Sequence, residues 1–232
     1  MIHMKFLKSG TRRGKRGFVM DQEKKPVFIY LCVLGIAMSF IGWLAENLAR
    51  SVMIGIFDAR FYILPFISAY ALIVFAFYYL IGDPNDFTFL GRRIFKERTK
   101  RTVVLSNLVS LLFCFAFVLV AELIVGNLWD ILFGVELWNY LDQPLHITQY
   151  TGVLPMLFFG GGGFVLSKFV FLPSLRFLQK KMPYKTAVIL VSVLGSLILI
   201  DTLRMIILMP IVGEAPIYWS YDLHKNVWTF NF

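Results

Sequence analysis

The chain has 232 residues, of which 58% are hydrophobic and only 16% are charged, with a mean hydropathy of +0.71. Because a soluble domain is nearer half apolar and a quarter charged, this composition excludes an ordinary water-soluble globule. The formal net charge of +9 would point to nucleic acid in a soluble protein. Here most cations stand beside long apolar segments, so we expect membrane lipids, with anionic headgroups foremost, and no nucleic acid as partners.

Five apolar segments long enough to cross a bilayer follow one another along the chain. A basic, polar segment at residues 1–26 precedes them, and an aromatic tail at 212–232 follows them. The predicted fold is all-α: a polytopic membrane helix bundle of about five transmembrane helices, in one domain over residues 27–211. The predicted spans are about 27–47, 61–81, 103–126, 148–172 and 186–211.

The basic residues alternate between the two sides of these spans. Residues 1–26, 82–102 and 173–185 hold eight, six and four Lys or Arg residues, whereas residues 48–60, 127–147 and the tail hold two, none and one. The positive-inside rule then predicts a cytoplasmic N-terminus and an extracytoplasmic C-terminus. All five tryptophans fall at or beyond the outer ends of spans, as interfacial anchors do: Trp43, Trp129, Trp138, Trp219 and Trp228.

Charged side chains inside the predicted spans gather in the half of the bundle that this topology places outside. A charge in hydrocarbon costs about 2.5–3.5 kcal/mol, so each one needs a reason. The first possible reason is structural: a carboxylate extends to the membrane interface, or two charges neutralise each other, as Asp201 and Arg204 could because they share a helical face. The functional reason is an outward-facing polar cavity for a small molecule, a headgroup or an ion. The candidate binding residues are Glu46, Arg60, Glu122, Trp138, Asp142, His146, Asp201 and Arg204.

Two further segments are unusual. Residues 128–147 are aromatic and acidic and lack cations, which fits either a re-entrant or interfacial helix or a membrane-surface loop. The glycine run at 160–163 has apolar flanks and no following Lys-Ser/Thr, so it predicts close helix packing or a kink rather than a phosphate loop. We expect no metal site and no cofactor, because the histidines are scattered at His3, His146 and His224.

A family resemblance adds to this interpretation. The stretch from Gly42 to Glu46 resembles the Gly-Trp-x-x-Glu motif that ends the first helix of the CmpB-type permease family of bacterial membrane proteins, described as Putative ABC-transporter type IV. The stretch 60–66 is a degraded counterpart of the Arg-Gly-Phe-Leu-Tyr-Gly-Pro that follows in that family. Later family elements look like Glu122, Phe133 to Tyr140 with Asn139 in place of an Asp, and Pro144 to Thr148.

The resemblance covers about residues 35–175 and implies a permease-like protein of the bacterial inner membrane. In this first hypothesis the protein binds a solute or lipid in the outer-leaflet polar cavity and carries no catalytic residues. Since the chain has no nucleotide-binding motif, ATP-driven transport would need a separate ATPase subunit, docked on the cytoplasmic loop 82–102.

Two alternatives stay open. The protein could be a membrane-embedded enzyme acting on a lipid or isoprenoid, with Glu46, Glu122 and His146 as acid or base and an arginine holding an anionic headgroup. It could also be a structural or assembly subunit, in which the buried charges only specify how helices pair.

Overall fold

The computed structural model describes residues 27–212 and 217–230, so the basic segment predicted at 1–26 lies outside the described residues. The chain is mostly helical, which confirms the predicted all-α membrane helix bundle. The helices are α1 (Val27–Ile54), α2 (Ser68–Leu80), α3 (Lys100–Phe133), α4 (Val153–Leu166), the π turn η1 (Ser167–Phe171), α5 (Leu172–Lys181), α6 (Tyr184–Leu190), the π turn η2 (Val191–Gly195) and α7 (Ser196–Val212). The strands are β1 (Ile56–Asp58), β2 (Gly82–Asp83), β3 (Asp86–Phe89), β4 (Arg92–Arg93), β5 (Trp219–Asp222) and β6 (Val227–Phe230).

Within the described residues, four helical segments are long and apolar enough to cross a membrane: Val27–Val52, Lys100–Phe133, Val153–Lys181 and Tyr184–Val212. The span predicted at 61–81 differs, because only the 13 residues of α2 are helical there. At 1.5 Å per residue α2 rises about 20 Å, which is short of the roughly 30 Å of a hydrocarbon core. Residues 61–67 precede it as irregular chain, so the second pass is a half-helix with a non-helical lead-in.

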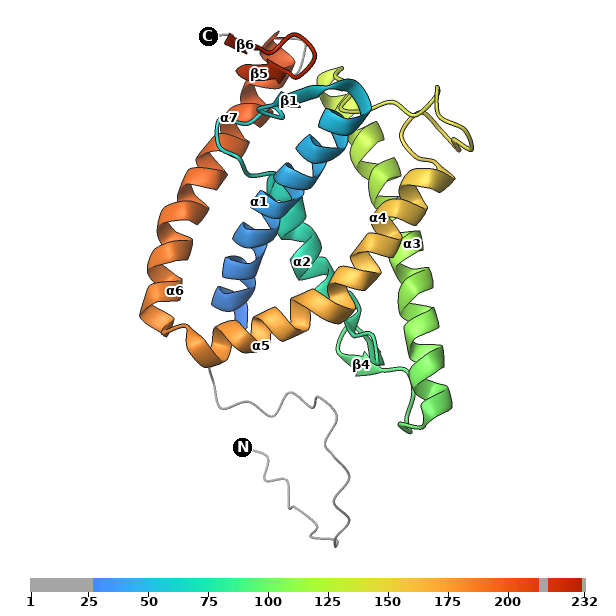
Figure 1. Cartoon of the computed structure of the whole chain (residues 1–232). Helices are drawn as coiled ribbons and strands as arrows, with labels where there is room; N and C mark the ends of the chain where they lie inside the picture. Colours follow the sequence, from blue (N-terminus) through green and yellow to red (C-terminus); the bar gives the residue numbers. More distant parts are fainter. Residues whose placement is uncertain (1–26, 213–216, 231–232) are drawn as a thin grey trace, which may run out of the picture.

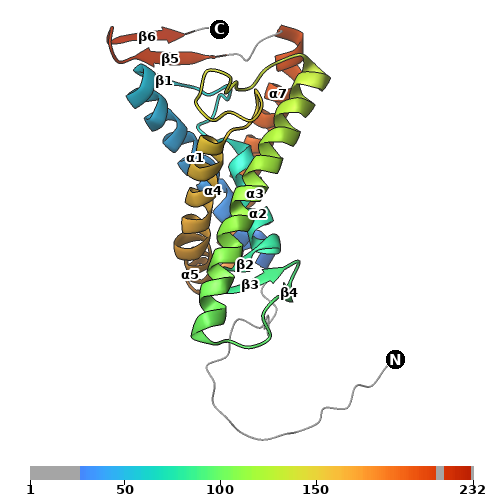
Figure 2. The same ribbon diagram turned by 90° about the vertical axis from the view of Figure 1, so that its right-hand side faces the viewer.

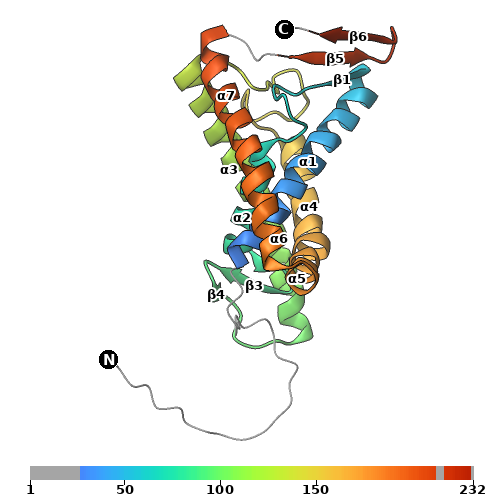
Figure 3. The ribbon, with the colours of Figure 1, turned by 90° about the vertical axis from the view of Figure 1, so that its left-hand side faces the viewer.

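The passes diverge toward one end of the molecule. In the side views, α1 separates from α3 and α7 toward that end, and the strands β1, β5 and β6 lie across it (Figures 2 and 3). We call this end the hairpin end. Half of the span in α1 is buried, against 11% for α3, because α1 stands centrally and packs along α2 (Figure 1).

The opposite end, where α1 begins, collects the cations of the loops, and we call it the basic end (Figure 1). Its cations come from the β2–β4 segment, the start of α3 and the α5–α6 junction: Arg92, Arg93, Lys96, Arg98, Lys100, Arg101, Arg176, Lys180, Lys181 and Lys185. The positive-inside rule places this end in the cytoplasm, and that orientation stays a prediction.

The described part of the aromatic tail forms a β-hairpin, which joins the C-terminal segment to the strand that follows α1. β5 pairs antiparallel with β1 and with β6. Beneath the sheet, Trp43 packs edge-on against Phe57 with ring centroids 5.4 Å apart, and Phe57 stacks on Trp219 at 5.9 Å. Trp43 is therefore buried under the hairpin and does not act as the lipid-facing anchor that its position at the end of a span predicts.

The segment after α3 is a loop. Gly134 ends the helix in the left-handed conformation (φ 65°), and its N–H donates to the carbonyl of Asp130 at 2.7 Å. Of the two alternatives for residues 128–147, the helix is wrong, because residues 128–133 complete α3 and residues 134–152 form turns. The loop still packs inward, since Val135 is buried in a cluster with Trp43 and Met209, and Tyr150, whose carbonyl accepts Trp138 Nε1 at 2.8 Å, is buried as well.

The glycine run in α4 allows the close packing that the sequence predicts. A Cβ on Gly160 would come within 3.0 Å of Cα of Phe115 and 3.2 Å of the carbonyl oxygen of Cys114, both in α3. A Cβ on Gly162 would meet no atom within 4 Å. The two glycines therefore lie on opposite faces of α4, one against α3 and the other against open space.

We expect Gly160→Ala to lower the free energy of unfolding by about 1–3 kcal/mol, because the added methyl collides with backbone that cannot rotate away. Thermal unfolding of the purified protein in detergent measures the effect, with Gly162→Ala as the matched control. Equal midpoints for the two variants would show that α3 and α4 do not touch at Gly160.

Candidate functional site

The polar residues of the passes are brought together toward the hairpin end in three hydrogen-bonded groups. Each group is centred on one carboxylate, and we name them the Glu46, Asp201 and Glu122 groups. They draw on α1, α2, α3 and α7, on the chain between β1 and α2, and on the loop before α4.

The Glu46 group ties α1 to the second pass. Nε and Nη2 of Arg60 both donate to one oxygen of Glu46, at 2.9 and 2.6 Å. The hydroxyl of Tyr70, in α2, donates to the other oxygen at 2.9 Å. With both charged side chains less than a quarter exposed, the pair interacts in a medium of lower permittivity than water, where hydrogen-bonded opposite charges attract strongly.

The turn that delivers Arg60 is conformationally unusual. Arg60 and Phe61 have φ of 53° and 72°, a region that costs residues other than glycine about 1–2 kcal/mol. The buried Asp58 holds the turn, because its Oδ1 accepts the backbone N–H of Arg60 at 2.9 Å and its Oδ2 accepts Arg50 at 2.9 Å. Asn47 accepts the N–H of Asp58 at 2.8 Å, so the end of α1 fixes the turn in place.

The Asp201 group satisfies the non-helical chain before α2. The carboxylate of Asp201, in α7 and 6% exposed, accepts the backbone N–H groups of Ile63 and Leu64 at 2.9 and 2.8 Å. It also accepts Nε and Nη2 of Arg204 at 3.0 and 2.7 Å, and Nη2 donates to the carbonyl of Phe61 at 3.3 Å. The pairing that the Asp201–Arg204 spacing allows is therefore present, and it supplies partners to backbone groups that lipid cannot hydrogen-bond.

The Glu122 group has no cation. One oxygen of Glu122, in α3, accepts the hydroxyl of Thr151 at 2.7 Å, and the other accepts the hydroxyl of Tyr140 at 3.3 Å. Among the ion pairs of the described residues, none includes Glu122. Glu122 is thus a carboxylate of an apolar helix whose charge no arginine of the described residues offsets.

Tyr140 links two of the groups. Burial raises the pKa of its hydroxyl above the ordinary tyrosine value, and the carboxylates of Glu122 and then Glu46 raise it further. The hydroxyl itself donates only to Glu122 among the hydrogen bonds of the described residues, so Glu46 acts on it through charge and not through contact. With its pKa raised, Tyr140 stays protonated and remains a hydrogen-bond donor at neutral pH.

The predicted site residues separate into two sets. Glu46, Arg60, Glu122, Asp201 and Arg204 belong to the three groups. The other three lie on the loop 134–152, where Trp138 fastens the loop to itself, Asp142 is exposed, and the exposed His146 approaches the carbonyl of Gln143 at 3.1 Å: Trp138, Asp142 and His146.

The sequence analysis missed the hydroxyl groups of the site. The hydroxyls of Tyr70, Tyr140 and Thr151 donate to carboxylates, whereas that of Tyr218 accepts from Arg204, which lies 4.5 Å from the centroid of its ring. A tyrosine in an apolar helix, such as Tyr70, is indistinguishable from a core aromatic by periodicity, so only its proximity to a charged group identifies it.

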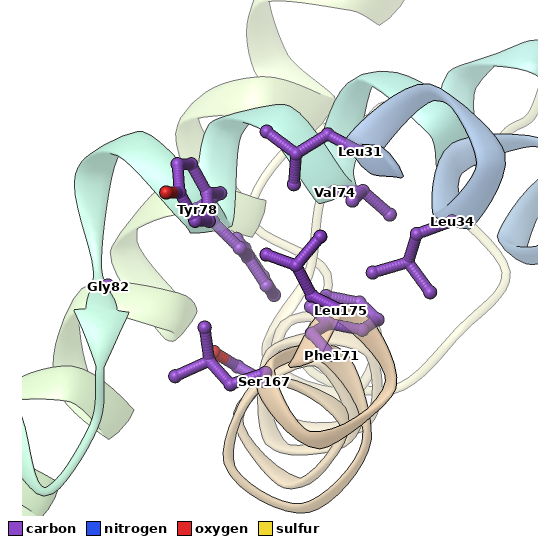
Figure 4. A pocket seen from close by; sticks show the side chains of 10 residues that line it. Leu31, Leu34, Val74, Tyr78, Gly82, Ser167, Phe171 and Leu175 are labelled. Atoms are coloured by element: carbon purple, nitrogen blue, oxygen red, sulfur yellow. The ribbon is translucent and has the colours of Figure 1, made fainter. Parts of the chain in front are cut away.

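A pocket deeper in the bundle lies apart from these groups (Figure 4). It holds about 10 Å³, which is room for at most one water molecule, so it is no solute site. Its lining is almost wholly apolar: Leu31, Leu34, Val74, Phe77, Tyr78, Gly82, Ser167, Phe171, Leu172 and Leu175. Within residues 27–212 and 217–230, no three His, Cys, Asp or Glu side chains are placed to hold a metal ion.

We expect Asp201→Asn to lower the free energy of unfolding by about 3 kcal/mol, because it leaves Arg204 uncompensated and weakens the hold on the non-helical chain. Denaturant unfolding of the protein in detergent micelles measures the loss. The control is Glu136→Gln, which alters an exposed carboxylate of the loop and should leave the midpoint unchanged. An unchanged midpoint for Asp201→Asn would refute the role given to this carboxylate.

Comparison with known proteins gives one family. No curated protein and no solved structure matches the chain. A family model described as Putative ABC-transporter type IV matches residues 33–206, which confirms the resemblance found at residues 35–175 and extends it into α7. With the four long apolar helices, the match identifies a multi-pass, transport-related membrane protein. Because the match spans most of the chain, the protein belongs to the Putative ABC-transporter type IV family.

Proposed function

We propose that this protein is a permease-like membrane component that binds the positively charged group of a solute or lipid headgroup at Glu122. The observation that carries the proposal is the absence of a cation from the hydrogen bonds and ion pairs of Glu122 among the described residues. A carboxylate offers about four acceptor positions, and two hydroxyls occupy only two of them. A cationic ligand would complete the coordination and offset the charge.

The remaining candidate residues would frame this site. Glu46 and Arg60, which bond each other, would contact the polar part of a ligand. Trp138, Asp142 and His146 lie on the loop that supplies both hydroxyls, so a ligand arriving at the hairpin end would meet this loop first. Asp201 and Arg204 would act at a distance, by holding the chain that presents Arg60.

The loop 134–152 would couple binding to movement. Tyr140 and Thr151, the two partners of Glu122, both belong to this loop, and Thr151 lies two residues before α4. A ligand that replaces these hydroxyls would therefore displace the loop and transmit the change to α4. Loops that supply ligand contacts on a rigid scaffold commonly move in this way.

A separate ATPase subunit is the energy source that the family relationship suggests. We propose that it docks on the loop 82–102, which forms β2, β3 and β4 beside the start of α3 (Figure 2). Exposed cations there, among them Arg92, Lys96 and Arg98, offer a positively charged surface to a partner at the basic end.

The docking proposal predicts that replacing Arg92, Lys96 and Arg98 together by Ser strongly reduces recovery of an ATPase with the tagged protein. Affinity purification from native membranes measures the recovery, and Lys225→Ser at the hairpin end is the control. Transport that continues after ATP depletion, in membranes from which no ATPase co-purifies, would refute it.

A structural or assembly role is the second candidate, because both intramembrane arginines are fully engaged. Arg60 bonds Glu46, and Arg204 bonds Asp201. Under this function Glu122 would only orient the loop through Tyr140 and Thr151, and its replacement would change stability or partner recovery without changing the binding of any small molecule.

Glu122→Gln distinguishes the two candidates. We expect choline, ethanolamine or spermidine to raise the melting temperature of the wild-type protein in nanodiscs, and the variant to lose at least tenfold in affinity for that cation by calorimetry. Glu136→Gln, on the same end of the molecule, should bind as the wild type does. If none of these cations stabilises the wild type, or if Glu122→Gln binds equally well, the binding function at Glu122 is wrong.

A further inference from the structure

A cation that the sequence analysis overlooked lies inside the fourth apolar pass. Lys168 belongs to the segment Val153–Lys181, which is long and apolar enough to cross a membrane. Its Nζ lies 5.6 Å from the ring centroid of Phe164 and 5.3 Å from that of Phe169. No carboxylate of the described chain forms an ion pair with it. A lysine in this position needs an anion, and none comes from residues 27–212 or 217–230.

The backbone changes direction at Lys168. The π turn η1 contains it, and Pro173 follows at the start of α5. In Figure 1, α4 runs obliquely and α5 continues it at a flatter slope across the basic end, where Figure 3 shows α5 nearly along its own axis. A π turn followed by a proline is an identifiable cause of such a bend.

α5 has the residue distribution of a helix that lies in the membrane interface. Leu172 and Leu175 are buried against the rest of the bundle, the exposed Arg176 and Lys180 flank that buried face, and Phe177, 63% exposed, lies opposite it. Asp83 is the anion that faces α5, 3.9 Å from Arg176. A transverse helix with an apolar inner face and basic outer residues lies at the level of the headgroups.

Above Lys168, α4 presents a smooth apolar surface away from the bundle. Gly161 and Gly162 leave open space where a side chain would stand, since the nearest atom to a Cβ on Gly161 is 3.9 Å away and none lies within 4 Å of one on Gly162. Val165 and Phe169 continue this surface toward the π turn and are at least half exposed. An acyl chain lying here would end beside the ammonium group of Lys168.

We propose that Lys168, with the cations of α5, binds the phosphate of an anionic phospholipid whose acyl chain lies along this face of α4. A phospholipid fits better than a soluble anion, because the ammonium group is flanked by two phenylalanine rings and continues an apolar surface. The excess of cations at this end favours a lipid with net negative charge over a zwitterionic one.

Native mass spectrometry of the full-length protein tests the proposal. In mixed micelles of phosphatidylglycerol and phosphatidylcholine, the wild type should retain phosphatidylglycerol preferentially, and Lys168→Met should reduce that retention about fivefold. Methionine is as long as lysine and suits a lipid-facing position, so folding should be unaffected. Lys168→Arg should keep the lipid, and so should Lys225→Met at the hairpin end.

Three results would overturn the proposal. The first is unchanged retention of phosphatidylglycerol by Lys168→Met. The second is equal retention of the two lipids by the wild type, which would mean that the surface is not selective for negative charge. The third is displacement of phosphatidylglycerol by millimolar inorganic phosphate, which would assign the site to a soluble anion. The outcome is independent of Glu122, which belongs to a different pass, α3, and lies toward the hairpin end.

Discussion

The hairpin end of this protein depends on the hydrogen bonds that the carboxylate of Asp201 accepts. It accepts two backbone N–H groups of a chain segment that is neither helix nor strand, while Arg204 on the same helix bonds a carbonyl of that segment. In a membrane, such backbone groups have no water with which to form hydrogen bonds, so irregular chain is tolerated only where other protein groups supply these bonds. The ion pair thus makes a broken second pass possible, and with it the turn that carries Arg60.

Once this segment is fixed, the two carboxylates of the neighbouring helices acquire different environments. Arg60 reaches Glu46 and neutralises it, whereas Glu122 receives only hydroxyl groups. Residues of one chemical type, at equivalent depths in two predicted spans, therefore differ in their remaining capacity for a charged partner. Our proposal that Glu122 is a binding position rests on this difference and not on the number of polar residues.

Hydropathy predicted the four long passes, because 20 or more apolar residues in a row have few other solutions. Hydropathy failed for residues 61–67, because Ile63 and Leu64 are as apolar as helical residues. The side chain that accepts their backbone N–H groups is Asp201, which lies 138 residues after Ile63. The charged residues of the site could be predicted because a charge in hydrocarbon costs free energy and therefore needs an explanation. Tyr140 and Thr151 could not, because an uncharged hydroxyl in a loop costs too little free energy to single it out. Lys168 was missed because it stands alone in an apolar run.

The antiparallel pairing of β1 with β5 joins the segment after the first helix to the segment after the last. β1 has no partner until β5 has been synthesised and carried across to the same side of the membrane, so the hairpin end closes late in biogenesis. Until then Trp43 and Phe57 lack the ring of Trp219. The nascent chain must therefore pass through a stage in which its apolar helices are inserted but this aromatic surface is uncovered. Quality-control factors that recognise exposed aromatic side chains could bind the chain at that stage.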